Sequence, residues 1–427
     1  MPDSLPPDSP QPESLLSGAA LLDRIDALAA ISAEEGRLSR LYLTPEHRRA
    51  NDLVAGWMRE AGMGVHEDAV GNIVGRYEGD KPGLPALLIG SHLDTVRDAG
   101  RYDGMLGVLS GIAVAADLHA RGRRLPFAVE VIGFGDEEGT RFQSTLIGSR
   151  AIAGTFDPAV LETRDAAGTR LADAMTAFGL DPAAWATAAY KAENVLAYAE
   201  LHIEQGPVLE ALGRPVGIVT AIAGATRLAV TVEGMAGHAG TVPMTLRRDA
   251  LAASAEMILA VEELCSGQER LVGTVGRIEA SPGATNVIPG KVRFTIDLRA
   301  DRDGLRLERV GAVRARLEAI ADARGVAIGF ETLHESPAVA CHPALMAQFA
   351  AAAEAEGLDA PELPSGAGHD AMAVAALTDI AMLFVRCDRG ISHNPAERIT
   401  AADAEAGARV LARFVEHFQP ATSSSIP

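Results

Sequence analysis

The first half of the chain alternates between helical stretches and short apolar runs. Apolar residues recur at helical spacing over residues 17–63, and residues 104–119 have the composition of a buried helix. Compact apolar runs typical of buried strands lie around them, at residues 84–90, 127–134 and 195–201. This alternation predicts an α/β fold in which a parallel or mixed sheet is covered by helices.

The pattern changes near Gly217. Residues 227–233 and 291–299 alternate polar and apolar side chains, as half-exposed strands do. Helical stretches at residues 247–264 and 305–323 interleave with them. The order strand–helix–strand–strand–helix–strand is that of a ferredoxin-like α+β domain, so we expect such a domain at residues 217–333.

The buried pattern resumes after the insertion, with a strand at residues 379–385 and a closing helix at residues 401–418. The larger domain is therefore expected to be discontinuous and to comprise residues 15–216 and 334–427. Residues 1–14 contain five prolines among Ser and Asp and predict a disordered tail.

Charge and cysteine content narrow the class of protein. The chain has 38 basic and 57 acidic residues, a formal net charge of −19. Such a surface repels phosphate backbones and anionic lipids, so neither nucleic acid nor a membrane is an expected partner. The three cysteines are an odd number without CxxC spacing, and the longest charge-free apolar run is too short to cross a bilayer. We therefore expect a cytoplasmic protein without disulfides.

Acids and histidines gather where the predicted strands end. The segments are GSHLDT at residues 90–95, RYDG at 101–104, DEEG at 136–139, LHIEQG at 201–206 and SHNP at 392–395. Ligands of open α/β sheets bind outside the carboxyl ends of strands, so five distant segments can converge on one pocket. They supply the five ligands needed by two divalent ions such as zinc or manganese: His92, Asp103, Glu138, His202 and His393. Asp94 can orient His92 by accepting its other ring N–H.

The order of these segments resembles the dinuclear-metal M20 amidohydrolases, over nearly the whole chain from about Leu21 to His417. LHIEQGPVLE at residues 201–210 resembles the ureido-hydrolase branch, which holds allantoate amidohydrolases, N-carbamoyl-L-amino acid hydrolases and β-ureidopropionases. The resemblance implies that His92 and His202 bind one ion, that Glu138 and His393 bind the other, and that Asp103 bridges them. It also implies that Glu137 is the general base.

The same resemblance implies how a substrate is held. It places Arg299 on a substrate carboxylate, with Asn286 and Gln205 as polar contacts. It places His238 as an oxyanion donor from a partner subunit, which implies a homodimer formed through the inserted lid domain. The glycine-rich segment from Ser365 to His369 can line the pocket or turn the chain before a helix, and both readings stay open.

These residues bear on four candidate functions. Stretches such as DEEGTRFQST at residues 136–145 and GAGHDAM at 366–372 resemble the allantoate amidohydrolases more closely. This resemblance implies hydrolysis of allantoate, a small anionic ureido compound, to ureidoglycine, ammonia and carbon dioxide. An N-carbamoyl-L-amino acid hydrolase, or a β-ureidopropionase, needs the same metals, base and arginine. An exopeptidase of the same superfamily is disfavoured by the HIEQGP segment. A non-catalytic binding protein would have lost Glu137 or a metal ligand, and all are present.

Overall fold

The computed structural model of the chain describes residues 15–421. The tail predicted at residues 1–14 lies outside them. The chain divides into two compact units. The first comprises the described residues up to Thr220, Cys341–Leu363 and those from His369 onward, and the second comprises Ala221–Ala340 and Pro364–Gly368.

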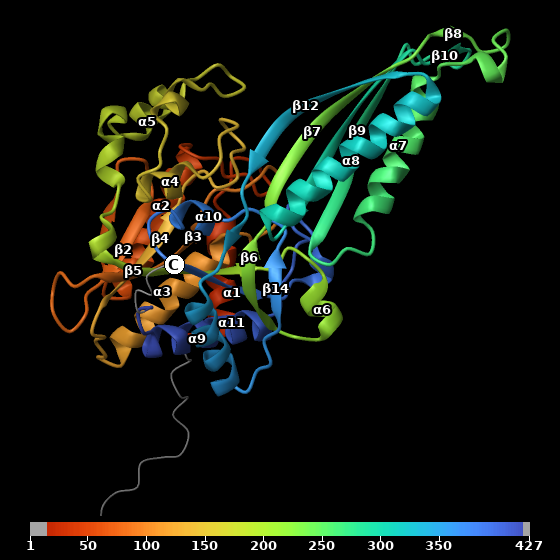
Figure 1. The fold of residues 1–427 in the computed structure, drawn as a ribbon. Helices are drawn as coiled ribbons and strands as arrows, with labels where there is room; N and C mark the ends of the chain where they lie inside the picture. Colours follow the sequence, from red (N-terminus) through yellow and green to blue (C-terminus); the bar gives the residue numbers. More distant parts are fainter. Residues whose placement is uncertain (1–14, 422–427) are drawn as a thin grey trace, which may run out of the picture. The chain divides into compact units, whose positions relative to one another are not determined.

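The first unit is built on a mixed sheet with the order β1-β2-β4-β3-β5-β15-β6, and β14 also pairs with β6 (Figure 1). Its four central strands β4, β3, β5 and β15 are parallel, whereas β1, β2 and β6 join antiparallel. The strands are β1 (Gly64–Glu67), β2 (Ile73–Tyr77), β3 (Ala86–His92), β4 (Ala128–Phe134), β5 (Val195–Ile203), β6 (Val216–Ile222), β14 (Glu362–Ser365) and β15 (Ile380–Val385). Every residue of β3, β4 and β15 is buried, as expected for parallel strands covered on both faces.

Helices complete the first unit. They are α1 (Gly18–Ala29), α2 (Pro45–Glu60), α3 (Met105–Ala120), α4 (Ile147–Ile152), α5 (Leu171–Phe178), α6 (Val208–Leu212), α9 (Pro343–Ala355), α10 (Ala371–Val374) and α11 (Ala401–His417). The main core joins α1, α2, α3, α9 and α11 to the sheet. The pattern expected to be helical over residues 17–63 contains two helices: the first ends at Ala29, and Thr44 caps a second that begins at Pro45.

The second unit has the predicted ferredoxin-like order. It runs β7 (Gly224–Glu233), α7 (Ala250–Cys265), β9 (Leu271–Ser281), β11 (Lys291–Ala300), α8 (Asp303–Arg324) and β12 (Ala327–Ser336). The antiparallel sheet has the order β12-β7-β11-β9, and α7 and α8 cover one face of it (Figure 1). The inward side chains of β11 are Val292, Phe294, Ile296 and Leu298, each at most 1% exposed. Short pairs add β8 (Gly237–His238) to β10 (Val287–Ile288) and β13 (Val339–Ala340) to β6.

The boundaries of the two units differ from those expected. The first crossing lies after Thr220 rather than Gly217, within β6, and the second lies after Ala340 rather than 333. Residues 364–368 also belong to the second unit. The expected boundaries were placed where the pattern of polar and apolar residues changes. Both β6 and β12 continue past that point, so the boundaries of the units lie further along the chain. The three cysteines are free and buried. Among residues 15–421, no helix combines the length and apolarity needed to span a bilayer.

A buried histidine links the first unit's stability to pH. His47 is fully buried; its Nδ1 accepts a hydrogen bond from the Leu43 N–H at 3.1 Å and its ring stacks on Phe178. Burial, aided by the nearby Arg40 and Arg48 cations, lowers the pKa of His47 to about 3. Because this value lies below that of the unfolded chain, the stabilisation is complete above about pH 6.5 and is lost as the pH falls towards 3.

Lowering the pH from 7 to 5 should therefore destabilise the first unit through His47 by about 2 kcal/mol. Both tryptophans, Trp57 and Trp185, lie in this unit, so urea unfolding followed by tryptophan fluorescence in chelator reports on it alone. His47→Gln should remove that part of the pH dependence. An equal change for wild type and variant would contradict the assignment.

Candidate metal centre

Asp103 lies at the centre of the predicted ligands. Its buried carboxylate precedes α3, and Oδ1 lies 3.2 Å from Nε2 of His202 and 3.5 Å from Nε2 of His92. Its Oδ2 lies 3.2 Å from Nε2 of His393, which is itself 3.4 Å from Oε1 of Glu138. The structure thus brings all five residues together as two groups, His92–Asp103–His202 and Asp103–Glu138–His393, that share one aspartate.

The sheet explains why these distant residues meet. His92 ends β3, Glu138 follows β4, His202 lies at the end of β5, and His393 follows β15. These four strands are neighbours and run parallel, so their carboxyl ends share one edge of the sheet.

Gly104 allows Asp103 to approach His92. It adopts a φ of 72°, in the left-handed region, and a Cβ on it would lie 2.5 Å from two atoms of the His92 ring. Any larger residue would combine backbone strain with a clash against a candidate ligand.

The histidine hydrogen bonds determine which nitrogen faces Asp103. Nδ1 of His92 lies 2.9 Å from the Asp94 carbonyl, and Nδ1 of His202 lies 2.9 Å from the Ile203 carbonyl. Since a carbonyl only accepts, Nδ1 donates in both rings and Nε2 faces Asp103; in the neutral form that a metal-binding histidine takes, this Nε2 carries the lone pair. Two lone pairs and a carboxylate oxygen that converge in this way are suited to a shared cation.

The residues present therefore fit divalent metal ions. Oδ1 of Asp103 is buried and forms no hydrogen bond to any of residues 15–421, despite its two histidine neighbours. Imidazole nitrogen and carboxylate oxygen form the donor set that zinc and manganese take in proteins.

The charge balance points the same way. Burial and the Asp103 carboxylate raise the pKa of Glu138 to about 7, and burial raises that of Glu137 well above its usual range although His92 opposes it. Burial would also raise the pKa of Asp103, but His202, His393 and His92 hold it well below its usual value. The charged forms of Glu137 and Glu138 are thus disfavoured by burial in the protein alone, and bound cations would stabilise them.

Asp94 differs from its prediction. We expected its carboxylate to accept the second N–H of His92, but Oδ1 lies 3.8 Å from His92 Nδ1, too far for a hydrogen bond. The carboxylate instead accepts hydrogen bonds from the backbone N–H groups of Glu137 at 3.0 Å and Glu138 at 3.3 Å. The main-chain carbonyl of Asp94 accepts the hydrogen bond from the His92 ring. Asp94 thus contacts both His92, through its carbonyl, and the DEEG turn, through its carboxylate.

Two predicted substrate contacts also lie in the first unit. Gln205 donates from Nε2 to Asp103 Oδ2 at 2.8 Å, so it touches the shared aspartate directly. The buried His369 packs edge-on against the His202 ring, with 4.5 Å between centroids. With Glu200 and His202 it forms a further group of potential ligands.

The other predicted contacts belong to the second unit. Arg299 lines a cavity of about 570 Å³ together with Arg227, Asp297 and Thr274. Its Nε and Nη2 donate to the Asp297 carboxylate at 2.9 and 3.1 Å, and Nη1 donates to the Gly366 carbonyl at 2.8 Å. Spacing on β11 places Asp297 and Arg299 on one face, a signal that the sequence carries and that we did not use.

His238 and Asn286 are brought together although they are far apart in the sequence. His238 pairs with Val287 across β8 and β10, and the Asn286 carbonyl accepts the Ala239 N–H at 2.9 Å. Both residues are exposed. Ser365, in the same unit, is buried, and its Oγ donates to the Ala367 carbonyl at 3.0 Å.

Comparison with known proteins decides the family. The model of peptidase family M20/M25/M40 matches residues 88–417. This chain belongs to that family. It is 46% identical to an N-carbamoyl-L-amino acid amidohydrolase of Geobacillus stearothermophilus, over 93% of this chain and 97% of that protein. It is 43% identical to a probable allantoate deiminase of Oryza sativa subsp. japonica, over 92% of this chain and 87% of that protein.

A solved structure supports the same family assignment. A hydantoinase/carbamoylase family amidase from Burkholderia multivorans superposes with a TM-score of 0.89 at 33% identity, covering 96% of this chain and all of that one. Membership of M20 makes the chain a hydrolase, and enzymes of this family typically bind divalent metal ions. The two ligand groups around Asp103 are where this M20 chain could hold them.

Two residues beside the M20 ligands were missed. Ser392 lies in the SHNP segment, which served only to indicate His393, and Glu397 lies two residues beyond it. Oγ of Ser392 lies 3.0 Å from Asp103 Oδ2, and Glu397 accepts the backbone N–H of Asp103 at 3.2 Å. No spacing rule predicts these contacts, because the partners are 289 and 294 positions apart.

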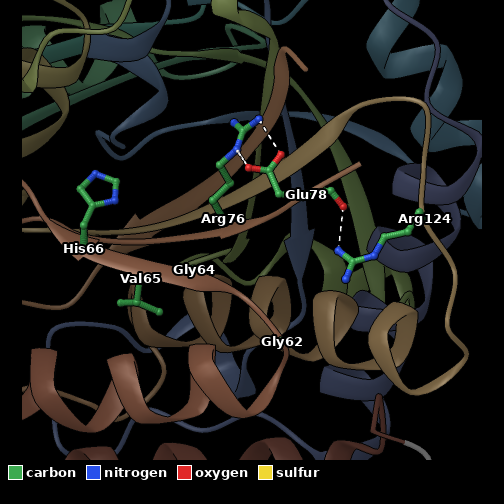
Figure 2. Close-up of a pocket in the computed structure, with 7 residues that line it drawn as sticks. All are labelled: Gly62, Gly64, Val65, His66, Arg76, Glu78 and Arg124. Carbon is green, nitrogen blue, oxygen red and sulfur yellow. Dashed lines mark hydrogen bonds and ion pairs between the residues drawn. The ribbon is translucent and has the colours of Figure 1, made fainter. Parts of the chain in front are cut away.

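A surface pocket of about 460 Å³ in the first unit contains none of the predicted site residues (Figure 2). In it, Glu78 engages both arginines: its carboxylate accepts from Arg76 Nε at 2.8 Å and its carbonyl from Arg124 Nη1 at 2.8 Å. The lining residues are Gly62, Gly64, Val65, His66, Arg76, Glu78 and Arg124.

Proposed function

We propose that this M20 enzyme hydrolyses the carbamoyl C–N bond of a small anionic ureido compound, with allantoate as its first substrate. The observation that carries the proposal is the aspartate shared by two ligand groups, with Glu137 beside them. Relatives named allantoate deiminase and N-carbamoyl-L-amino acid amidohydrolase support the bond that is cleaved. The allantoate-like stretches of the sequence support the substrate, and the products would be ureidoglycine, ammonia and carbon dioxide.

Two divalent ions, zinc or manganese, would be held by the five ligands, and Asp103 belongs to both ligand groups. When bound, such ions supply Lewis acidity that activates a water molecule and polarises the ureido carbonyl.

Glu137 is the proposed general base. Asp94 holds its backbone N–H, and its carboxylate lies within 4.8 Å of ligand atoms of His92 and Glu138. Glu137 would take a proton from the attacking water and deliver it to the leaving nitrogen, which separates its role from that of the neighbouring Glu138.

We further propose that Arg299 binds the substrate carboxylate, with Asn286, Gln205, Ser365 and His369 as polar contacts. A guanidinium fork matches a carboxylate, and the cavity at Arg299 has the size of a small-molecule site. To accept a second carboxylate, Arg299 has to share or release Asp297. His238 would donate to the oxyanion from the partner in a homodimer, which the exposure of this histidine permits. A cytoplasmic location remains a prediction.

An N-carbamoyl-L-amino acid is the second candidate substrate, favoured by the 46% identity to the Geobacillus enzyme. Purified protein loaded with Mn²⁺ or Zn²⁺ should be assayed for ammonia release from allantoate and from a panel of N-carbamoyl-L-amino acids. A dipeptide panel tests the peptidase reading.

We expect kcat/KM for allantoate to exceed that for each N-carbamoyl-L-amino acid by at least about tenfold, the discrimination that one pocket contact supplies. Turnover of a carbamoyl amino acid without ammonia from allantoate would replace the first substrate by the second. Hydrolysis of dipeptides alone would overturn the ureido assignment.

A further inference from the structure

Glu397 is a buried carboxylate that reaches the loop of the shared aspartate from the other end of the sequence. It is 2% exposed and lies between His393 and α11. Its Oε1 accepts the backbone N–H of Tyr102 at 2.9 Å and that of Asp103 at 3.2 Å. One carboxylate oxygen thus fixes the main chain from which the Asp103 side chain projects.

The second oxygen of Glu397 connects to the Asp103 carboxylate through a hydroxyl. Oγ of Ser392 lies 2.9 Å from Glu397 Oε2 and 3.0 Å from Asp103 Oδ2. Gln205 Nε2 donates to that Oγ at 3.2 Å and to Asp103 Oδ2 at 2.8 Å. The backbone of Asp103 is therefore bound to Glu397 directly. Its side chain is linked to Glu397 through Ser392, whose single hydroxyl proton is donated to one of the two carboxylates at a time.

The packing around Glu397 leaves this carboxylate little freedom. A Cβ on Gly100 would lie 2.3 Å from Cδ of Glu397 and 2.4 Å from its Oε1. Gly100 therefore leaves the space that the carboxylate fills, and a methyl group there would displace Glu397 without changing its chemistry.

We propose that Glu397 is a positioning residue for the shared aspartate and thereby sets the affinity of this site for divalent metal. The inference rests on the proposed metal centre. Glu397 contacts the backbone of one ligand loop and Ser392 of the other, so its loss lets Asp103 and His393 move independently. Partners outside the ligand shell typically contribute about 10- to 100-fold in metal affinity.

The experiment measures Mn²⁺ binding to the full chain, with free Mn²⁺ followed by electron paramagnetic resonance and bound metal by elemental analysis. Glu397→Ala should weaken binding of at least one ion by about 10- to 100-fold. Gly100→Ala should act in the same direction, because it displaces the Glu397 carboxylate although the glutamate itself is kept. Glu397→Gln, whose amide oxygen still accepts the two backbone N–H groups, should retain more affinity than the alanine variant.

Asp68 provides the matched control. Its Oδ1 accepts the backbone N–H groups of Val70 and Asn72, both at 2.9 Å, and its Oδ2 accepts from the Asn72 side chain at 2.7 Å, the same pattern of bonds. Asp68→Ala should lower the thermal stability of the metal-free protein yet leave Mn²⁺ affinity unchanged. Gly56→Ala, at a position with open space, is the control for Gly100→Ala.

Wild-type affinity in both Glu397→Ala and Gly100→Ala would overturn the positioning role while leaving the proposed function intact. An equal loss of affinity in Asp68→Ala would also overturn it, because the effect would then be one of general stability. A wild-type chain that binds no Mn²⁺ or Zn²⁺ would overturn the metal centre itself, and the proposed function with it.

Discussion

Glu137→Gln should reduce ureido hydrolysis by about 10²- to 10⁴-fold while the protein keeps its full metal content. Glutamine has nearly the size of glutamate and leaves the backbone N–H free to donate to Asp94, so the DEEG turn stays in place. The amide cannot take a proton from water, and the proton transfer that lowers the barrier is lost. The measurement is kcat for the favoured ureido substrate, with bound metal determined on the same sample.

The neighbouring acid supplies the control for this result. Glu138 lies 3.4 Å from His393 through its carboxylate and is a proposed ligand, so Glu138→Gln should lower activity through loss of metal. Added Mn²⁺ should restore part of the activity of Glu138→Gln and none of that of Glu137→Gln. Metal loss from Glu137→Gln would show that Glu137 is itself a ligand, an arrangement that its proximity to His92 and Glu138 permits.

Asp103→Asn should abolish high-affinity binding of metal. The loss of affinity should exceed the change of about 10- to 100-fold expected for Glu397, which contacts a ligand and not the metal. Two candidate ligand groups of the described residues are His92–Asp103–His202 and Asp103–Glu138–His393. Asp103 is the only residue that they share. Its replacement removes one ligand from each and the negative charge between them. Activity should fall to background, because both ions are affected by one substitution.

Thermal unfolding provides a second readout for Asp103. Metal at about 1,000 times its dissociation constant stabilises a folded protein by about 4 kcal/mol per site. The rise in unfolding temperature on adding Mn²⁺ should therefore be large for wild type and absent for Asp103→Asn. Asp301→Asn, at a buried aspartate of the second unit, should keep the full rise. A normal rise in Asp103→Asn would remove Asp103 from the ligand set.

The strands that hold the site could be predicted because parallel strands buried on both faces read as continuous apolar runs. The runs at residues 84–90, 127–134 and 195–201 correspond to β3, β4 and β5. β9 gave no such signal: only its first residue is buried, and it contains two glycines. β6 was missed for another reason, because the change of pattern that marked the inserted domain falls within it.

The candidate ligands could also be predicted, since a rule of sheet topology converts strand ends into neighbours. The hydrogen bonds around them could not. Whether Asp94 offers His92 its carboxylate or its carbonyl depends on how the DEEG turn folds back, and Asp136 in that turn adopts a φ of 65°. The contact between Glu397 and the Asp103 loop depends on the assembled fold, because the two residues are 294 positions apart in the sequence.

The division of the chain has a consequence for its synthesis. Residues 221–340 form most of the second unit as one continuous stretch, whereas β15 pairs with β5 only after residue 380 has been made, as in the pair Ile380–Tyr198. On the ribosome the inserted unit can therefore complete its core while the sheet of the first unit still lacks a central strand. His393 and Glu397 emerge later still, so the centre built around Asp103 is among the last parts of the nascent chain to form.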